Sequence, residues 1–285
     1  MISTDQEYNN KMATALGTVG TVFWCIQLVP QIYTNFRRRD TTGLPPMMMF
    51  LWAVSGVLFG MYFVPQAPSL PLVIQPQIFT AFCLITFGQC LYFPPARKSL
   101  ARTMLYTLGL AALGGGIELA FALPFKNSHY FAVVHNRSPH TWPLILVGVL
   151  AALALLGGLI QPYFGIFRRK GQVLGINFFF LMIDSTGAIF SFASLLFPQT
   201  NDDGSAVPRD YLGMILYLFV PLLEGGIVLS HCYWYFTIGR RLRAEQSSSK
   251  IPDPEKLDSL TTQQTDDTLA HNNLESLQDH RESEK

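Results

Sequence analysis

The chain has 285 residues, of which 49% are hydrophobic and only 14% are charged, with a formal net charge of +1. Together with a positive mean hydropathy of +0.27, this composition excludes an ordinary soluble domain and fits a polytopic membrane protein. A net charge this close to zero gives no reason to expect a nucleic-acid partner.

Seven apolar runs, each of about 20 residues or more, are long enough to cross a bilayer. They cover roughly residues 13–36, 44–64, 72–93, 103–123, 143–164, 174–197 and 211–238. A polar N-terminus, residues 1–12, precedes them, and a polar tail without aromatic residues, 244–285, follows. Such a tail buries too little apolar surface to offset the entropy of ordering, so we expect it to be disordered.

Basic residues mark every second connection between the runs. The clusters are Arg37-Arg38-Arg39, Arg97-Lys98 with Arg102, Arg168-Arg169-Lys170 and Arg240-Arg241 with Arg243. Because cytosolic connections of membrane proteins are enriched in lysine and arginine, we expect a lumenal or outside N-terminus and a cytosolic C-terminus.

The connection over residues 124–142 lies on the lumenal side in this topology. Its Asn136-Arg137-Ser138 is an acceptor pattern for glycosylation. The same loop holds His129, His135 and His140, but their spacing fits no standard metal-ligand pattern, so a solvated loop is the favoured interpretation. The chain also shows no nucleophile–base constellation and no phosphate loop, so we expect neither an enzyme nor a bound cofactor.

A motif at the end of the first run returns, in altered form, at the end of the fifth. Pro30-Gln31 precedes Arg37-Arg38-Arg39. When the two segments are aligned with Phe36 on Phe167, the reversed pair Gln161-Pro162 aligns with Pro30-Gln31, and Arg168-Arg169-Lys170 aligns with the three arginines. Further along, Gly43-Leu44 and Gly175-Ile176 both open the next run. A proline inside a membrane helix kinks it and is tolerated where protein or a cavity satisfies the freed carbonyl.

This repeat predicts the architecture. Residues 13–93 form one three-helix unit, residues 143–238 form a second in parallel orientation, and residues 103–123 form the linker helix between them. Parallel repeats of this kind are a known transporter plan, with the substrate site between the halves. The fold class is therefore an all-α, seven-helix membrane protein arranged as three plus one plus three.

The run Pro30-Gln31-Ile32-Tyr33-x-Asn35-Phe36-Arg37-Arg38, followed by a Gly-Leu helix start, resembles the PQ-loop repeat family. That family includes cystinosin and the vacuolar or lysosomal cationic amino-acid exporters, and the SWEET sugar transporters are structural relatives. The resemblance covers about residues 13–243. It implies that Pro30 and Gln31 form one hinge for alternating access, and that Gln161 and Pro162, in reversed order, form the other.

Three acidic side chains lie inside the predicted runs: Glu118, Asp184 and Glu224. A carboxylate at membrane depth costs a few kcal/mol and usually has a function or carries a proton. The sequence Asp184-Ser185-Thr186-Gly187 is similar to the Asp-x-Thr-Gly of the cystinosin branch, which implies that Asp184 couples protons to transport. Hydrogen bonding for packing alone is the alternative.

The other polar groups have weaker assignments. Glu224, between Pro221 and Gly225-Gly226, is a candidate for the substrate pathway with a structural role equally open, and we expect Glu118 to lie near the lipid headgroups. Asn177 and Gln89 are further pathway candidates, with helix-to-helix hydrogen bonds as the alternative. The second run lacks the acidic residue that the cationic amino-acid exporters carry there, which argues against a cationic substrate.

The leading interpretation is a proton-coupled transporter of a small polar solute, with an amino acid as first candidate. It would move the solute from an acidic, vacuole-like or lysosome-like organelle to the cytosol, in contact with membrane lipid. The alternative is a non-transporting cargo or sorting receptor of the same fold. The sequence leaves the solute, the organelle and the oligomeric state open.

Overall fold

The computed structural model describes residues 4–66, 70–127, 142–198, 200 and 211–241. The chain divides into two compact units, Met1–Tyr233 and Trp234–Lys285. Among the described residues of the second unit is a short π-helix, η2, at Tyr235–Gly239. The loop residues Asn136, His129, His135 and His140 lie outside the described residues, and so does the tail, 244–285.

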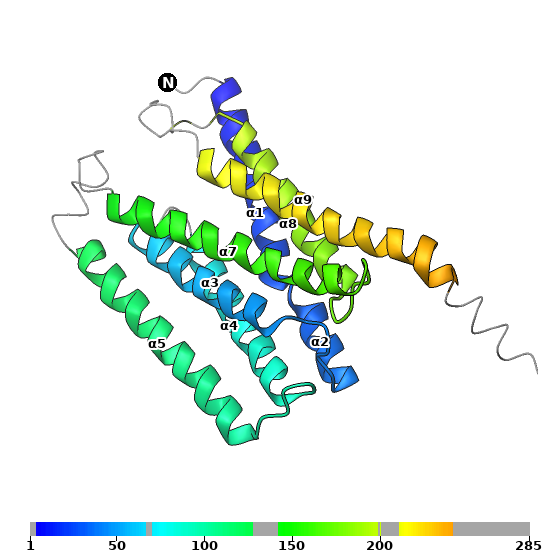
Figure 1. Cartoon of the computed structure of the whole chain (residues 1–285). Coiled ribbons are helices and arrows are strands. Elements are labelled where there is room, and N and C mark those ends of the chain that lie inside the picture. The colour runs from blue at the N-terminus through cyan, green and yellow to red at the C-terminus, as the bar shows by residue number, and fades with distance from the viewer. Residues whose placement is uncertain (1–3, 67–69, 128–141, 199, 201–210, 242–285) are drawn as a thin grey trace, which may run out of the picture. The chain divides into compact units, whose positions relative to one another are not determined.

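The elements in the described part of the chain are all helices (Figure 1). They are α1 Thr4–Ile26, α2 Val29–Arg38, α3 Pro46–Gln66, α4 Leu70–Tyr92, α5 Leu100–Asn127, α7 Trp142–Arg168, α8 Phe178–Leu196 and α9 Tyr211–Trp234. Seven stretches are long and apolar enough to span a membrane, with α1 and α2 together forming the first. The prediction of an all-α protein with seven membrane-spanning segments is confirmed.

The helices of the first unit pack in a crossed pattern. The most extensive interfaces are α3 on α7 and α1 on α8, so the first helix of each predicted repeat packs on the second helix of the other. This is the pairing expected of two similar units related by an axis along the membrane normal. The linker helix α5 packs on α3 and α4, along one flank of the first unit (Figure 1).

Small residues bring α1 and α8 close together. Gly20 lies so near Ser191 and the carbonyl of Gly187 that a methyl group at Gly20 would collide with both, and Gly17 faces Ser194. Gly187 in turn leaves room for the indole of Trp24. Close approach through glycine and serine is the usual way that membrane helices gain packing contacts.

The interface of α3 with α7 is built around a large side chain instead. Trp52 is fully buried, fits against Gly158, and donates its indole N–H to the carbonyl of Leu155 at 3.1 Å. The hydroxyl of Ser55 donates to the carbonyl of Ala151 at 2.9 Å. Both hydrogen bonds are fully buried, and they fix the two helices in register.

Only one of the two predicted proline sites interrupts its helix. The first span breaks at Gln27-Leu28, and α2 starts again at Val29 with Pro30 as its second residue, a position at which the missing N–H needs no partner. In contrast, α7 continues through Pro162 to Arg168. The predicted break at the first motif is confirmed, and the second motif lies within an unbroken helix.

Candidate functional site

The candidate site has three layers between the repeats. We locate them relative to the arginine end of the bundle, defined as the end that carries Arg37–Arg39 and Arg168–Lys170, and number them toward that end. The links that follow these clusters meet there, because Gly43 and Gly175 contact each other's neighbouring backbone. Their φ values of +98° and +78° are in the region that favours glycine, and a Cβ at either position would collide with the opposite link.

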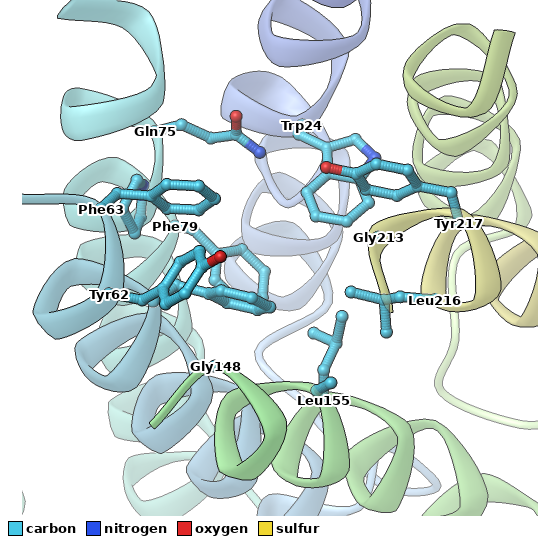
Figure 2. A pocket seen from close by; sticks show the side chains of 13 residues that line it. Trp24, Tyr62, Phe63, Gln75, Phe79, Gly148, Leu155, Gly213, Leu216 and Tyr217 are labelled. Atoms are coloured by element: carbon cyan, nitrogen blue, oxygen red, sulfur yellow. The ribbon is translucent and has the colours of Figure 1, made fainter. Parts of the chain in front are cut away.

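The first layer is a pocket at the opposite end, between α1, α3, α4, α7 and α9. Its empty volume, including the part open to the outside, is about 700 Å³. Figure 2 shows the rings of Tyr62, Phe63 and Phe79 on one side, facing Trp24 and Tyr217 on the other. The indole of Trp24 and the ring of Tyr217 pack edge to face, with centroids 5.4 Å apart.

The pocket lining is uncharged. Its polar side-chain groups are the Gln75 amide, which lies between the two aromatic sides in Figure 2, the hydroxyls of Tyr62 and Tyr217, and the Trp24 indole N–H. The remaining lining residues are aliphatic or aromatic, or are glycine and proline. A pocket of this kind orients a solute by apolar contact and a few hydrogen bonds.

The second layer is an acid pair, defined here as Asp184 on α8 and Glu224 on α9. Both side chains are buried, with 4% and 0% of their surface exposed, and their carboxyl groups are in hydrogen-bonding contact. Since carboxylates only accept hydrogen bonds, a bond between two carboxyl groups requires a proton on one of them. The pair therefore has the chemistry to hold one exchangeable proton.

Neighbouring groups hold the pair in place. Ser185 donates its hydroxyl to Glu224 Oε2 at 2.6 Å, while Glu224 Oε1 has no N–H or O–H donor within the described residues. With its amide turned so that both ends are satisfied, Gln27 donates to both oxygens of Asp184. Gln27 lies in the break directly after α1, three residues beyond Trp24, so the end of the first span supplies both a wall of the pocket and a partner of the acid pair.

The third layer is the Gln31 network at the arginine end. The fully buried Gln31 amide donates to Asn35 Oδ1 at 2.8 Å and to the Gly175 carbonyl at 2.9 Å, and it accepts the Asn177 N–H at 2.7 Å. Gln31 therefore binds the second repeat's link directly. Asn35 extends the network by donating to Gln89 Oε1 at 2.9 Å.

Asn177 and Gln89 complete this network rather than lining the pocket. Asn177 caps the start of α8 by accepting the Phe179 N–H at 2.8 Å, and its amide donates to Thr34 Oγ1 at 2.7 Å. Gln89 donates to the Ile32 carbonyl at 3.1 Å. The helix-to-helix alternative describes these contacts, and a role for either residue toward the solute stays a prediction.

The second motif has no matching network. Gln161 is half-buried, and Pro162, which takes the place of Gln31 in the repeat alignment, is buried but has no group to donate. The hinge role of Gln161 and Pro162 therefore remains untested, as does that of Pro30 and Gln31.

Glu118 is buried against two neighbouring helices. Only 8% of its surface is exposed, and its carboxyl group lies against Gly60 of α3 and accepts a hydrogen bond from Gln77 of α4. Packing of α5 onto α3 and α4 buries Glu118 between these helices, and its position near the lipid headgroups stays a prediction.

Sequence reasoning missed several parts of the site. Gln27, Ser185 and the pocket residues Trp24 and Gln75 were not recognised as site residues. One usable signal was the spacing of Trp24 and Gln27, which lie three residues apart at the end of the first span, as neighbours on one helix face do.

Comparisons with known proteins identify the family of the chain. A model of the PQ loop repeat matches residues 12–72. The chain is 35% identical over 272 residues to the uncharacterized membrane protein YDR090C of Saccharomyces cerevisiae, an alignment that covers 94% of this chain and 83% of that protein.

Two other relatives from Saccharomyces cerevisiae match locally. They are the vacuolar histidine transporter YPQ3, 30% identical over 84 residues (30% of this chain, 28% of that protein), and the vacuolar lysine transporter YPQ1, 33% identical over 82 residues (29% and 27%). The motif at Pro30-Gln31, the seven spanning segments and these matches lead to one conclusion: the chain is a multi-pass membrane protein of the PQ-loop repeat family.

Proposed function

We propose that this protein is a proton-coupled transporter that moves a small polar solute, an amino acid, from the lumen of a vacuole-like or lysosome-like organelle to the cytosol. Family membership and the local likeness to vacuolar histidine and lysine transporters support transport of an amino acid. The observation that carries the proposal is the acid pair, buried between a pocket at one end and the Gln31 network at the other.

The arginine end faces the cytosol in this proposal, since cytosolic connections are rich in arginine and lysine. The described conformation then has a pocket toward the lumen and is closed toward the cytosol by the Gln31 network. Opening toward the cytosol requires Gln31 to release Gly175 and Asn177. The break at Leu28, between α1 and α2, is the hinge that allows it.

The acid pair links proton binding to this motion. Gln27 lies in the break between α1 and α2, while Asp184 and Glu224 lie on α8 and α9, so their contacts join the break to two helices of the second repeat. Loss of the shared proton leaves two adjacent carboxylates, and no lysine or arginine is among their contacts in the described residues. Like charges at contact repel strongly at low dielectric, which separates α8 from α9 and favours a different arrangement of the helices.

Proteoliposomes test the proposal. When the vesicle interior is acidic, we expect the pH gradient to drive export of a radiolabelled amino acid by the wild-type protein. We expect Asp184→Asn and Glu224→Gln to lose this stimulation by the gradient. Glu118→Gln is the matched control, because it neutralises a buried carboxyl group outside the site. Full gradient dependence in Asp184→Asn would contradict the mechanism. Absence of flux for every amino acid, with specific peptide or protein binding, would favour a cargo receptor.

A further inference from the structure

The pocket is lined by rings and small uncharged groups, and this chemistry limits which amino acid can enter it. We propose that the pocket binds amino acids with uncharged apolar side chains, such as leucine and phenylalanine, and rejects those with cationic side chains. The inference rests on the proposed function, because it names the substrate class of the same site.

The first argument is electrostatic. No aspartate, glutamate, lysine, arginine or histidine lines the pocket among the described residues. Every amino acid brings an α-ammonium and an α-carboxylate, which largely neutralise each other, so the side chain decides the net charge. A lysine or arginine side chain would lose water without gaining a partner of opposite charge, and burial of an unpaired ion is strongly unfavourable.

The aromatic rings do not replace a missing carboxylate. A cation over one ring face regains part of the hydration that it loses, but a primary ammonium is compact and strongly hydrated. Trp24 and Tyr217 already pack on each other edge to face, which occupies part of their ring surface. Apolar side chains gain from the same surfaces without any such cost.

The acid pair is placed to bind a proton rather than the substrate's side chain. Neither Asp184 nor Glu224 lines the pocket, and both are already engaged, with each other and with Gln27 and Ser185. The two relatives named as lysine and histidine transporters match only a part of this chain, so their substrates do not determine which amino acid this pocket binds.

Binding to the full-length protein in nanodiscs separates the possibilities. We expect saturable binding of radiolabelled L-leucine, displaced by L-phenylalanine and displaced roughly tenfold less well by L-lysine and L-arginine, a ratio that corresponds to about 1.4 kcal/mol. Lysine or arginine bound as tightly as leucine would overturn the inference and leave the proposed function standing. Binding of none of the four would overturn the inference, whereas the proposed function is overturned only when no amino acid at all is transported.

A charge placed in the pocket sharpens the test. Gln75→Glu puts a carboxylate of almost the same shape between the aromatic sides, and we expect it to weaken leucine binding and strengthen lysine binding, each by roughly tenfold. Gln75→Leu is the matched variant, with similar volume and no charge, and it should not gain lysine binding. A Gln75→Glu protein that still prefers leucine as the wild type does would show that leucine binds elsewhere, and would overturn the assignment. Tyr217→Phe keeps the ring and should retain the preference for leucine if Gln75→Glu fails to fold.

Discussion

The α1·α8 and α3·α7 interfaces use the same positions of the two repeats, yet they contain different chemistry. When Phe36 is set on Phe167, Gln27 corresponds to Gly158, and when Gly43 is set on Gly175, Trp52 corresponds to Asp184. Gln27 contacts Asp184 across the first interface, and Gly158 contacts Trp52 across the second. An amide–carboxyl contact on one side is therefore replaced by a glycine–tryptophan contact on the other.

This difference assigns different tasks to the two sides. The α3·α7 interface is filled by a buried indole and fixed by two buried hydrogen bonds, so it has few groups that respond to protons or solute. The α1·α8 interface holds an ionisable group, lies beside the helix break at Leu28, and ends at the Gln31 network. We interpret α3·α7 as the fixed pivot and α1·α8 as the interface that rearranges.

The largest effect is expected when the indole of Trp52 is removed from the α3·α7 interface. Trp52→Ala leaves a large cavity between α3 and α7, and we expect it to lower the free energy of unfolding by about 3–5 kcal/mol, as for other buried aromatic truncations. Trp24→Ala is the matched variant, since Trp24 borders the pocket and already lacks neighbours on one side. Unfolding followed by tryptophan fluorescence and circular dichroism measures both. An equal loss for the two variants would argue against α3·α7 as the pivot.

The next test breaks the Gln31 network. Gln31→Leu leaves Gly175 and Asn177 without their partner, and unsatisfied buried groups cost about 1–3 kcal/mol each. We expect the arginine end to open more often. The buried thiol of Cys90, on α4 next to Gln89, reports this opening when the other cysteines are replaced by serine.

The labelling rate of Cys90 with a maleimide should rise about tenfold in Gln31→Leu, since each 1.4 kcal/mol changes an opening equilibrium tenfold. Gln161→Leu is the control from the second repeat, where no equivalent network exists, and its Cys90 should react as in the wild type. Equal acceleration by both substitutions would mean that the two motifs close the protein together.

The parts of this site that the sequence predicted are those that depend on local chemistry. The helix break before Pro30 and the seven spans follow from residue type and spacing. Gly43 and Gly175 were expected to open the next helices, but they lie in the links before α3 and α8, with positive φ values. Asp184 and Glu224 were recognised because a carboxyl group inside an apolar run is costly. That the two meet depends on how α8 and α9 are rotated about their axes, and a helix that is apolar all round carries little periodic signal of its rotation.

Helix ends limited the prediction in a second way. Asn177 was placed inside the sixth run, but it is the cap of α8, and its contacts follow from that position. Hydropathy marks the apolar stretch and not the residue at which the helical hydrogen bonds begin. The burial of Glu118 could not be predicted for a related reason, because it depends on which face of α5 packs on α3 and α4.

A smaller effect is expected from the glycines of the α1·α8 interface. Gly20→Ala places a methyl group against Ser191 and the Gly187 carbonyl, and overpacking of this kind costs about 1–3 kcal/mol. Gly17→Ala is the matched variant, because its nearest contact, Ser194 Oγ, would be at an ordinary 3.6 Å. We expect Gly20→Ala to reduce both stability and gradient-driven flux, and Gly17→Ala to leave both nearly unchanged. A neutral Gly20→Ala would show that the two helices are not held at this close distance.

The smallest expected effect lies in the link that follows α2, at the arginine end. Asp40 accepts hydrogen bonds from the Thr42 hydroxyl at 2.7 Å and the Thr42 N–H at 2.8 Å, and these bonds lower the pKa of Asp40 below its ordinary value of 3.8. A carboxyl group whose pKa is lowered by folding stabilises the fold at any pH above its pKa in the unfolded chain. That contribution is lost as the pH falls through the lower pKa of the folded state.

Asp40→Asn should therefore lower the melting temperature slightly, and by the same amount at pH 7 and pH 5, because Asp40 is ionised at both. The second link has a glycine and a glutamine, Gly171 and Gln172, after its basic cluster, and Gln172→Ala is the comparison there, with no pH dependence expected. A difference between wild type and Asp40→Asn that shrinks between pH 7 and pH 5 would mean that Asp40 titrates within this range, and that the Thr42 contacts do not hold it ionised.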